Sequence, residues 1–303
     1  MVARCVALSS KVALVSGANK GIGKEIVRLL SQSSSSSYDD DEEDEGWIIF
    51  LGSRDRRRGE DAVKELSKDL PKNIKIICCP LDLTDESTIQ ATKEMVETQG
   101  NGGKLDVLIN NAAICFNDPT LYGKVPYTPF EQQANITVQT NFFGTLKVTQ
   151  TMLPLLQESD SSPRIINIAS SAGRLGILKS KELFDTFTSS NLQLSKLESL
   201  LQTFVKEVEN GTHASKGWPN TCYGMSKLGI IALTKILARE YPTIMVNSVD
   251  PGYCCTDQNN NQGILPATRG AVTPVLLAKL PADTDTTNFI TGRHFFQERE
   301  IEW

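Results

Sequence analysis

The chain has 303 residues, of which 40% are hydrophobic and 22% charged, and its net charge is −5. This is the composition of an ordinary globular protein, and a chain of this length can bury a core without disulfides. Much of the negative charge comes from one run of seven acids at positions 39–45, and the rest of the chain is close to neutral. Because lysines and arginines are not clustered in the sequence, no nucleic-acid partner is expected.

Targeting and redox signals are weak. No stretch of about 18 apolar residues is present, so no membrane-spanning helix is expected, and the residues before Lys11 are too few and too polar for a signal peptide. The seven cysteines are odd in number and show no CxxC spacing, so neither a zinc site nor a redox dithiol is predicted. Reduced thiols in a cytoplasmic protein are the expectation.

Apolar runs alternate with amphipathic stretches along the chain. The expected strands cover 12–15, 47–52, 74–79, 105–110, 164–169, 244–249 and, as an edge strand, 289–295. The expected helices cover 22–30, 58–70, 86–98, 132–157 with a possible kink at Pro154, and 223–241. Continuously apolar strands separated by helices favour a parallel sheet with both faces covered. We therefore expect one α/β domain over 1–303, a Rossmann-type doubly wound parallel sheet.

Two segments interrupt this rhythm. Residues 31–46 are a serine run followed by the acidic run, a composition typical of a disordered, solvated loop, with an acidic docking segment as the alternative. Residues 175–219 lie between an expected strand and the helix that follows. They carry leucine, phenylalanine and valine at helical spacing, which predicts a helical insertion packed on the body.

A glycine-rich turn follows the first expected strand. Gly17 permits a tight turn, and Gly21 and Gly23 let the backbone approach a pyrophosphate at the positive end of the next helix. The neighbouring candidates for cofactor binding are Asn19, Lys20 and Ile22. The spacing GxxxGxG indicates a dinucleotide site, although a phosphate loop or chance remains open at this point, and no Walker Lys-Ser/Thr pair follows.

The second expected strand ends at Arg54, where NAD-binding proteins often place an acid. A guanidinium suits the 2′-phosphate of NADP, and Lys20 could reach the same anion. The alternative is that Arg54 is a solvated surface residue. Asp82 and Leu83, after the third expected strand, are candidates for contact with the adenine.

Tyr223 and Lys227 are four residues apart and therefore share one face of the predicted helix. Carbonyl reduction needs a proton delivered to oxygen as hydride reaches carbon. A free tyrosine ionises near pH 10, and a neighbouring ammonium favours its phenolate. The pair therefore predicts a tyrosine acid/base, although YxxxK alone would often be coincidence.

Together with Asn110-Asn111-Ala112 and the serines that end a strand, these motifs resemble the short-chain dehydrogenase/reductase family over nearly the whole chain. The resemblance implies that Ser171 holds the substrate carbonyl oxygen and that Tyr223 is the acid/base. It also implies that Lys227 binds the nicotinamide ribose and that Asn141 anchors a water relay. The other cofactor residues that it implies are Asn111, Ala112, Pro251, Gly252 and Thr256.

The long insertion before Tyr223, the preceding Gly-Trp-Pro and the terminal Ile-Glu-Trp are similar to the monomeric, NADPH-dependent carbonyl reductases. This resemblance implies NADPH as cofactor, small carbonyl substrates (ketones, aldehydes, quinones) and a monomer. A narrow-substrate ketone reductase of a biosynthetic pathway and a non-catalytic NADPH-binding regulator remain as alternatives. Phe116 and Tyr253 are expected to line the substrate pocket, and oxidation of Cys222 could block the site.

Overall fold

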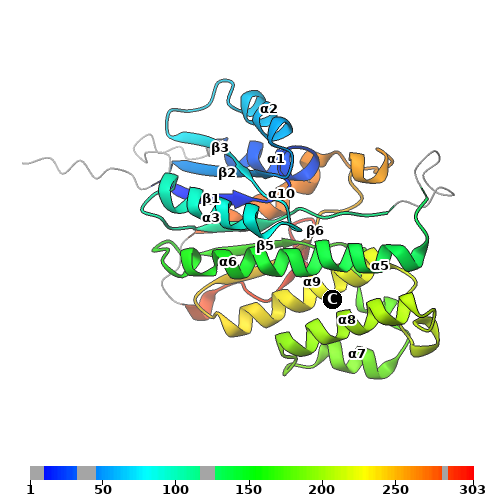
Figure 1. Cartoon of the computed structure of the whole chain (residues 1–303). Coiled ribbons are helices and arrows are strands. Elements are labelled where there is room, and N and C mark those ends of the chain that lie inside the picture. Colours follow the sequence, from blue (N-terminus) through cyan, green and yellow to red (C-terminus); the bar gives the residue numbers. More distant parts are fainter. Residues whose placement is uncertain (1–9, 33–45, 117–126, 282–285) are drawn as a thin grey trace, which may run out of the picture.

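The computed structural model describes residues 10–32, 46–116, 127–281 and 286–303. In these parts of the chain, eight strands form one sheet in the order β3-β2-β1-β4-β5-β6-β7-β8 (Figure 1). The strands are β1 (Lys11–Val15), β2 (Trp47–Ser53), β3 (Ile74–Pro80), β4 (Val107–Asn110), β5 (Arg164–Ile168), β6 (Met245–Asp250), β7 (His294–Phe296) and β8 (Arg299–Ile301). Neighbouring strands are parallel up to β7, and β8 is antiparallel to β7.

Helices cover both faces of this sheet. The longer ones are α1 (Gly21–Leu30), α2 (Arg56–Leu66), α3 (Glu86–Gln99), α5 (Phe130–Val138), α6 (Thr145–Gln157), α7 (Lys181–Thr188), α8 (Leu194–Glu209), α9 (Cys222–Glu240) and α10 (Ala267–Ala278). One apolar core joins the sheet to α1, α2 and α10, and the other joins it to α3, α5, α6, α8 and α9. The expected doubly wound α/β domain is therefore confirmed.

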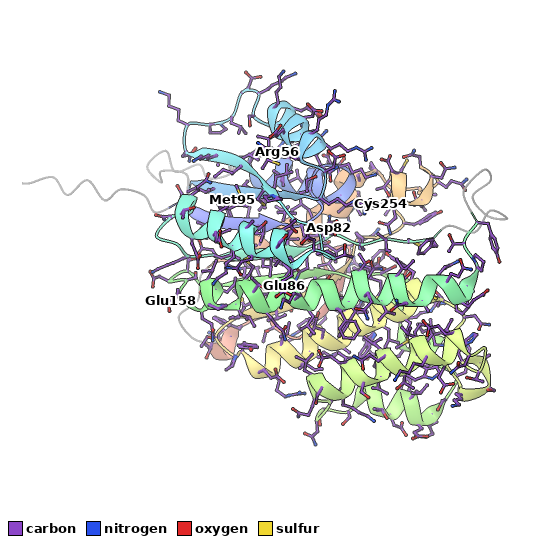
Figure 2. All side chains as sticks on the ribbon, in the orientation of Figure 1. Arg56, Asp82, Glu86, Met95, Glu158 and Cys254 are labelled. Carbon is purple, nitrogen blue, oxygen red and sulfur yellow. The ribbon has the colours of Figure 1, made fainter. Side chains whose placement is uncertain are left out.

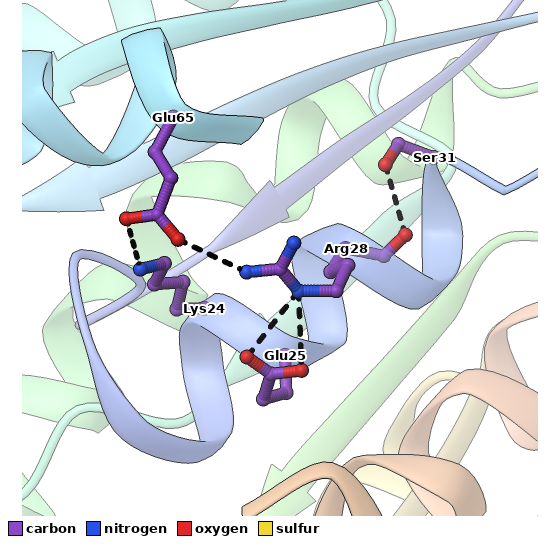
Figure 3. Close-up of polar contacts among 5 residues, drawn as sticks. All are labelled: Lys24, Glu25, Arg28, Ser31 and Glu65. Carbon is purple, nitrogen blue, oxygen red and sulfur yellow. Dashed lines mark hydrogen bonds and ion pairs between the residues drawn. The ribbon is translucent and has the colours of Figure 1, made fainter. Parts of the chain in front are cut away.

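The α1–α2 side is tied by a small charged cluster (Figure 3). Glu65 on α2 pairs with Lys24 at 2.6 Å and with Arg28 at 3.2 Å, and Arg28 also pairs with Glu25 at 3.3 Å. The hydrogen bond from Lys24 lowers the pKa of Glu65. These contacts hold α1 in place, and α1 is the helix that begins at the glycine-rich turn.

The expected strands lie within two or three residues of the observed ones at the centre of the sheet. At its edge the expectation is wrong, because the strand predicted over 289–295 is shorter and shifted, and β8 forms the true edge. Helix α10 was not expected at all. Among the described helices, none is long and apolar enough to cross a membrane.

The segment 175–219 is helical, as expected, and contains α7 and α8. The buried residues of α8 are Leu197, Leu200, Leu201, Phe204, Val205 and Val208. In Figure 1, α7 and α8 form an outer layer beneath α5 and α9. The acidic run of the 31–46 segment lies outside the described residues.

The long helix predicted over 132–157 is interrupted near its middle. Between α5 and α6, residues 139–144 form a π-helical turn. Pro154 lies inside α6 and does not end it. A π turn bulges the helix by one residue, and such bulges occur frequently at functional sites; this one carries Asn141.

Candidate active site

The turn between β1 and α1 has the geometry of an anion-binding turn. Gly17 has φ +62°, and a Cβ there would lie 2.9 Å from the Cα of Ala112. Lys20 is the N-cap residue of α1, and no side chain of the described residues caps this helix. By contrast, Asp55 caps α2 and Thr221 caps α9. The free N–H groups at the start of α1 can therefore serve a phosphate, for which the helix dipole is favourable.

Asn111 braces this turn from the end of β4. Its side-chain amide donates to the carbonyls of Ser16 at 2.9 Å and Gly17 at 3.1 Å. A Cβ on Gly23 would lie 2.5 Å from the same amide, so glycine is required there by packing. Glycine is therefore needed at position 23 because α1 packs closely against the end of β4, and not because a ligand occupies that space.

A cleft lies at the carboxyl ends of the strands, where open parallel sheets bind their ligands. Asp82 and Cys254, which follow β3 and β6, lie at this same end of the sheet (Figure 2). The cleft is lined by Gly17, Asn19, Lys20, Gly21, Ile22, Arg54, Leu81, Asp82, Leu83, Asn111, Ala112, Ala113, Ile114, Cys115, Thr140, Thr256, Asp257 and Gln258. The cleft therefore brings together the glycine-rich turn, Arg54, Asp82 and the end of β4, as the sequence predicts.

Arg54 lines the cleft, and the acidic residue beside it is paired with Arg58. The acid next to it, Asp55, accepts a hydrogen bond from the backbone of Arg58 at 3.0 Å and pairs with the Arg58 side chain at 3.4 Å. Arg54 itself is exposed and lines the cleft. A guanidinium at this position can pair with a second phosphate on the ribose.

Tyr223 and Lys227 lie in the first turns of α9, as predicted. The Lys227 ammonium is buried, donates to the carbonyl oxygen of Ile168 at 2.6 Å, and lies 5.7 Å from the centre of the Tyr223 ring. Burial lowers the pKa of Lys227 to about 8. Burial also raises the pKa of the Tyr223 phenol, and the side chains of Gln258 and Ser170 oppose that rise.

The serine beside the tyrosine is Ser170, which corrects the choice of Ser171 made from the sequence. Ser170 has extended backbone that continues from β5, and its hydroxyl also accepts from the backbone of Ala172 at 3.2 Å. Ser171 begins the following turn and is exposed. Because adjacent residues leaving a strand point in different directions, only the first of the two serines reaches Tyr223.

Asn141 is fully buried in the π turn and joins three elements. Its amide accepts from the backbone N–H of Ile114 at 2.8 Å and donates to the carbonyl of Ile114 at 2.9 Å. It also donates to the Ser226 hydroxyl on α9 at 3.1 Å. Asn141 therefore positions the chain after β4 against the helix of Tyr223 and Lys227.

Several predicted residues stand apart from the cleft. Gly23, Pro251, Gly252, Phe116 and Tyr253 are absent from its lining, and so are the four predicted catalytic residues, Asn141, Ser171, Tyr223 and Lys227. Sequence reasoning missed Gln258, which follows Thr256 by two residues on the loop after β6. Gln258 lines the cleft.

A doubly wound sheet with an uncapped glycine turn, and a tyrosine–lysine pair on a helix that Asn141 joins to the cleft residue Ile114, define the site of a dinucleotide-dependent oxidoreductase. Residues 11–181 match the family model for short chain dehydrogenase. The chain therefore belongs to the short-chain dehydrogenase family.

Individual relatives resemble the chain over almost its full length. Carbonyl reductase 1 of Bos taurus, named as an NADPH enzyme, is 34% identical over 302 residues, covering 97% of this chain and 99% of that protein. The structure of salutaridine reductase from Papaver somniferum has a TM-score of 0.77 at 27% identity, covering 94% and 99% of the two chains. Menthone neomenthol reductase from Mentha piperita has a TM-score of 0.75 at 29% identity, covering 96% and 100%.

Proposed function

We propose that this chain is an NADPH-dependent carbonyl reductase that converts ketones, aldehydes or quinones to alcohols. The observation that carries the proposal is the pair of Tyr223 and Lys227 on α9, with the ammonium 5.7 Å from the centre of the tyrosine ring. Asn141 joins this helix to Ile114, a residue of the cleft that Arg54 also lines. The relatives support it, because they include a reductase named for NADPH and reductases of the plant ketones salutaridine and menthone.

The cleft residues fit NADPH. The start of α1 would hold the pyrophosphate, Arg54 and Lys20 the 2′-phosphate, and Asp82 and Leu83 the adenine. Thr256 would contact the nicotinamide end, and Lys227 its ribose. When bound, NADPH supplies the hydride.

The side chains supply the proton. A carbonyl oxygen held between the hydroxyls of Ser170 and Tyr223 would be polarised by two donors, and Tyr223 would transfer its proton to that oxygen. The Lys227 ammonium stabilises the phenolate that remains, because opposite charges favour the ionised form. Asn141 is hydrogen-bonded both to Ile114 and to Ser226 on α9, so it holds the chain after β4 against this helix.

The test is oxidation of NADPH, followed by its absorbance, with a panel of quinones, aromatic aldehydes, vicinal diketones and cyclic terpenoid ketones. NADH and the Tyr223→Phe variant are the controls. Turnover of several classes, with NADPH preferred and Tyr223→Phe inactive, is the expected result. Turnover of one narrow class would favour a dedicated pathway enzyme. NADPH binding without any turnover would favour a non-catalytic regulator.

The monomeric state is part of this proposal. Helix α8 packs on both α5 and α9 with its apolar face, so it covers surface that those helices would otherwise offer to a second copy. Light scattering on the purified protein tests this, with one chain per particle as the expected result. One domain over 1–303 and a cytoplasmic location complete the proposal.

A further inference from the structure

Trp303 lies against the turn that follows β5, although the two are 130 residues apart in the sequence. Its indole N–H donates a hydrogen bond to the carbonyl oxygen of Gly173 at 3.1 Å. The Lys235 ammonium on α9 lies 5.8 Å from the centre of the indole ring, and the ring packs against the core that contains α9. Trp303 therefore joins the turn after β5 to the helix that carries Tyr223 and Lys227.

The turn that Trp303 holds is the one that begins at Ser170. Ser170 is its N-cap residue, and residues 171–173 form a single 3₁₀ turn. The backbone N–H of Gly173 donates to the carbonyl of Ser170 at 2.9 Å, and the Ser170 hydroxyl accepts from the backbone N–H of Ala172 at 3.2 Å. These bonds join the two ends of the turn, so a displacement of Gly173 is transmitted to Ser170.

The same turn packs directly on the part of α9 that carries the tyrosine–lysine pair. A Cβ on Gly173 would lie 2.6 Å from the backbone nitrogen of Leu228 and 2.6 Å from the carbonyl carbon of Lys227. A Cβ on Gly224 would lie 2.6 Å from the carbonyl oxygen of Ala172. The distance between the turn and α9 is therefore set by backbone contact, and a side-chain bond that holds the turn in place preserves that contact.

We propose that Trp303 is a positioning residue for the reduction, because its hydrogen bond to Gly173 keeps the turn of Ser170 seated on α9. This inference rests on the proposed function, in which a carbonyl oxygen is held between the hydroxyls of Ser170 and Tyr223. Trp303 acts through the turn, since it is absent from the cleft lining and takes no part in the transfer of proton or hydride. A misplacement of about 1 Å can slow an enzyme about a hundredfold, so even partial loosening of the turn should lower kcat.

The variant Trp303→Phe removes the indole N–H and retains an aromatic ring beside Lys235. With the best carbonyl of the panel it should lower kcat about tenfold. The KM for NADPH should change little, because Trp303 is outside the cleft lining. Trp47→Phe is the matched control, since Trp47 begins β2 at the end of the strand opposite the cleft, and its ring likewise lies near an ammonium, that of Lys11 at 5.9 Å. It should retain the wild-type kcat even if it lowers the free energy of unfolding.

The double variant Ser170→Ala/Trp303→Phe separates positioning of the serine from a general structural effect. If Trp303 acts through Ser170, Trp303→Phe should cause little further loss of kcat once the Ser170 hydroxyl is gone, because the two effects are coupled. A tenfold loss in both backgrounds would mean that Trp303 acts on something other than the serine. That result, or an unchanged kcat in Trp303→Phe alone, would overturn the proposal.

A second measurement needs no turnover. Hydrogen exchange of the backbone amides of residues 172–174, with NADP⁺ present, should be faster in Trp303→Phe than in the wild type and in Trp47→Phe, because the turn has lost a bond that holds it. Equal exchange in all three proteins would refute the role of Trp303. If no carbonyl is turned over, the proposed function fails, whereas the exchange still decides whether Trp303 holds the turn.

Discussion

The ammonium of Lys20 lies 2.9 Å from the carboxylate of Asp257, and the two side chains line opposite walls of the same cleft. Lys20 is the N-cap residue of α1, next to the uncapped N–H groups that suit a phosphate. A phosphate entering the cleft must therefore compete with Asp257 for Lys20. The hydrogen bond from Lys20 lowers the pKa of Asp257, so this carboxylate is charged at neutral pH.

Replacing Asp257 by asparagine should strengthen NADPH binding. Lys20 would lose its competing partner, and one negative charge would leave the phosphate site. Because the pair is exposed, the gain should be modest, about twofold to fivefold, as for a surface pair of up to about 1 kcal/mol. Titration of NADPH fluorescence measures it. Asp160→Asn removes an equal charge from an exposed surface pair outside the cleft lining and should leave the affinity unchanged. Weaker binding by Asp257→Asn would mean that the acid holds the loop rather than opposing the phosphate.

The two adjacent serines should differ sharply. The Ser170 side chain lowers the pKa of the Tyr223 phenol, whereas Ser171 is exposed at the start of a turn. Ser170→Ala should lower kcat by about 10² to 10³, the usual effect of losing one donor to a developing oxyanion. Ser171→Ala should retain near-normal turnover. Steady-state kinetics with the best carbonyl of the panel measures kcat for both variants. A larger loss in Ser171→Ala than in Ser170→Ala would support the assignment made from the sequence.

Arg54 should determine the preference of the enzyme for NADPH over NADH. Arg54→Asp replaces a partner of the 2′-phosphate with a like charge, so kcat/KM with NADPH should fall about tenfold to a hundredfold. With NADH, which lacks that phosphate, the change should be small. Arg57→Asp makes the same charge change at an exposed residue outside the cleft lining and serves as the control. Equal losses with both cofactors would show that Arg54 acts on something other than the phosphate.

Cys222 should be inert despite lying next to Tyr223. Its side chain is 2% exposed, and its thiol donates to the carbonyl of Phe130 at 3.8 Å. Burial raises the pKa of this thiol to about 12, so almost none of it is the reactive thiolate at neutral pH. The enzyme carrying Cys222→Ser should therefore lose activity to N-ethylmaleimide as fast as the wild type. Protection by that single substitution would support the oxidation hypothesis after all.

The centre of the fold could be predicted because buried parallel strands are continuous apolar runs. β1 and β2, for example, are buried almost throughout and were placed within a residue or two. Helix α10 was missed because it contains Gly270 and Pro274, which usually argue against a helix. Both are buried in the structure, and a Cβ on Gly270 would lie 2.5 Å from the Cys254 sulfur. Close packing therefore outweighs the low helix propensity.

The site was predictable where a motif has a fixed local geometry. Tyr223 and Lys227 needed only the helical repeat, and the glycine turn needed only its spacing. Two features depended on contacts distant in sequence: the π turn held by Asn141 and Ile114, and the direction of Ser170. Neither feature changes the spacing of hydrophobic residues along the chain, so neither can be predicted from that spacing.

His294 should make the protein less stable in mild acid. It is buried on β7, and its Nδ1 lies 2.9 Å from the hydroxyl of Ser248. Burial lowers its pKa below the ordinary 6.5, with the nearby Asp250 carboxylate opposing and the Lys235 ammonium adding to the shift. The folded state therefore resists protonation more than the unfolded chain does. The stability that this histidine contributes is complete above about pH 6.5 and is lost as the pH falls toward the lower folded pKa.

The matched variant is His294→Asn, which keeps a polar group near Ser248 but cannot titrate. Urea unfolding at about pH 7 and about pH 5.5 measures the free energy of unfolding of both proteins. The wild type should lose more of it between the two conditions than the variant, even if the variant is less stable at pH 7. The difference isolates His294, because the carboxylates that also titrate in acid are common to both proteins. Equal losses would mean that His294 takes up its proton in the folded state as readily as in the unfolded chain, so that another group sets the acid sensitivity.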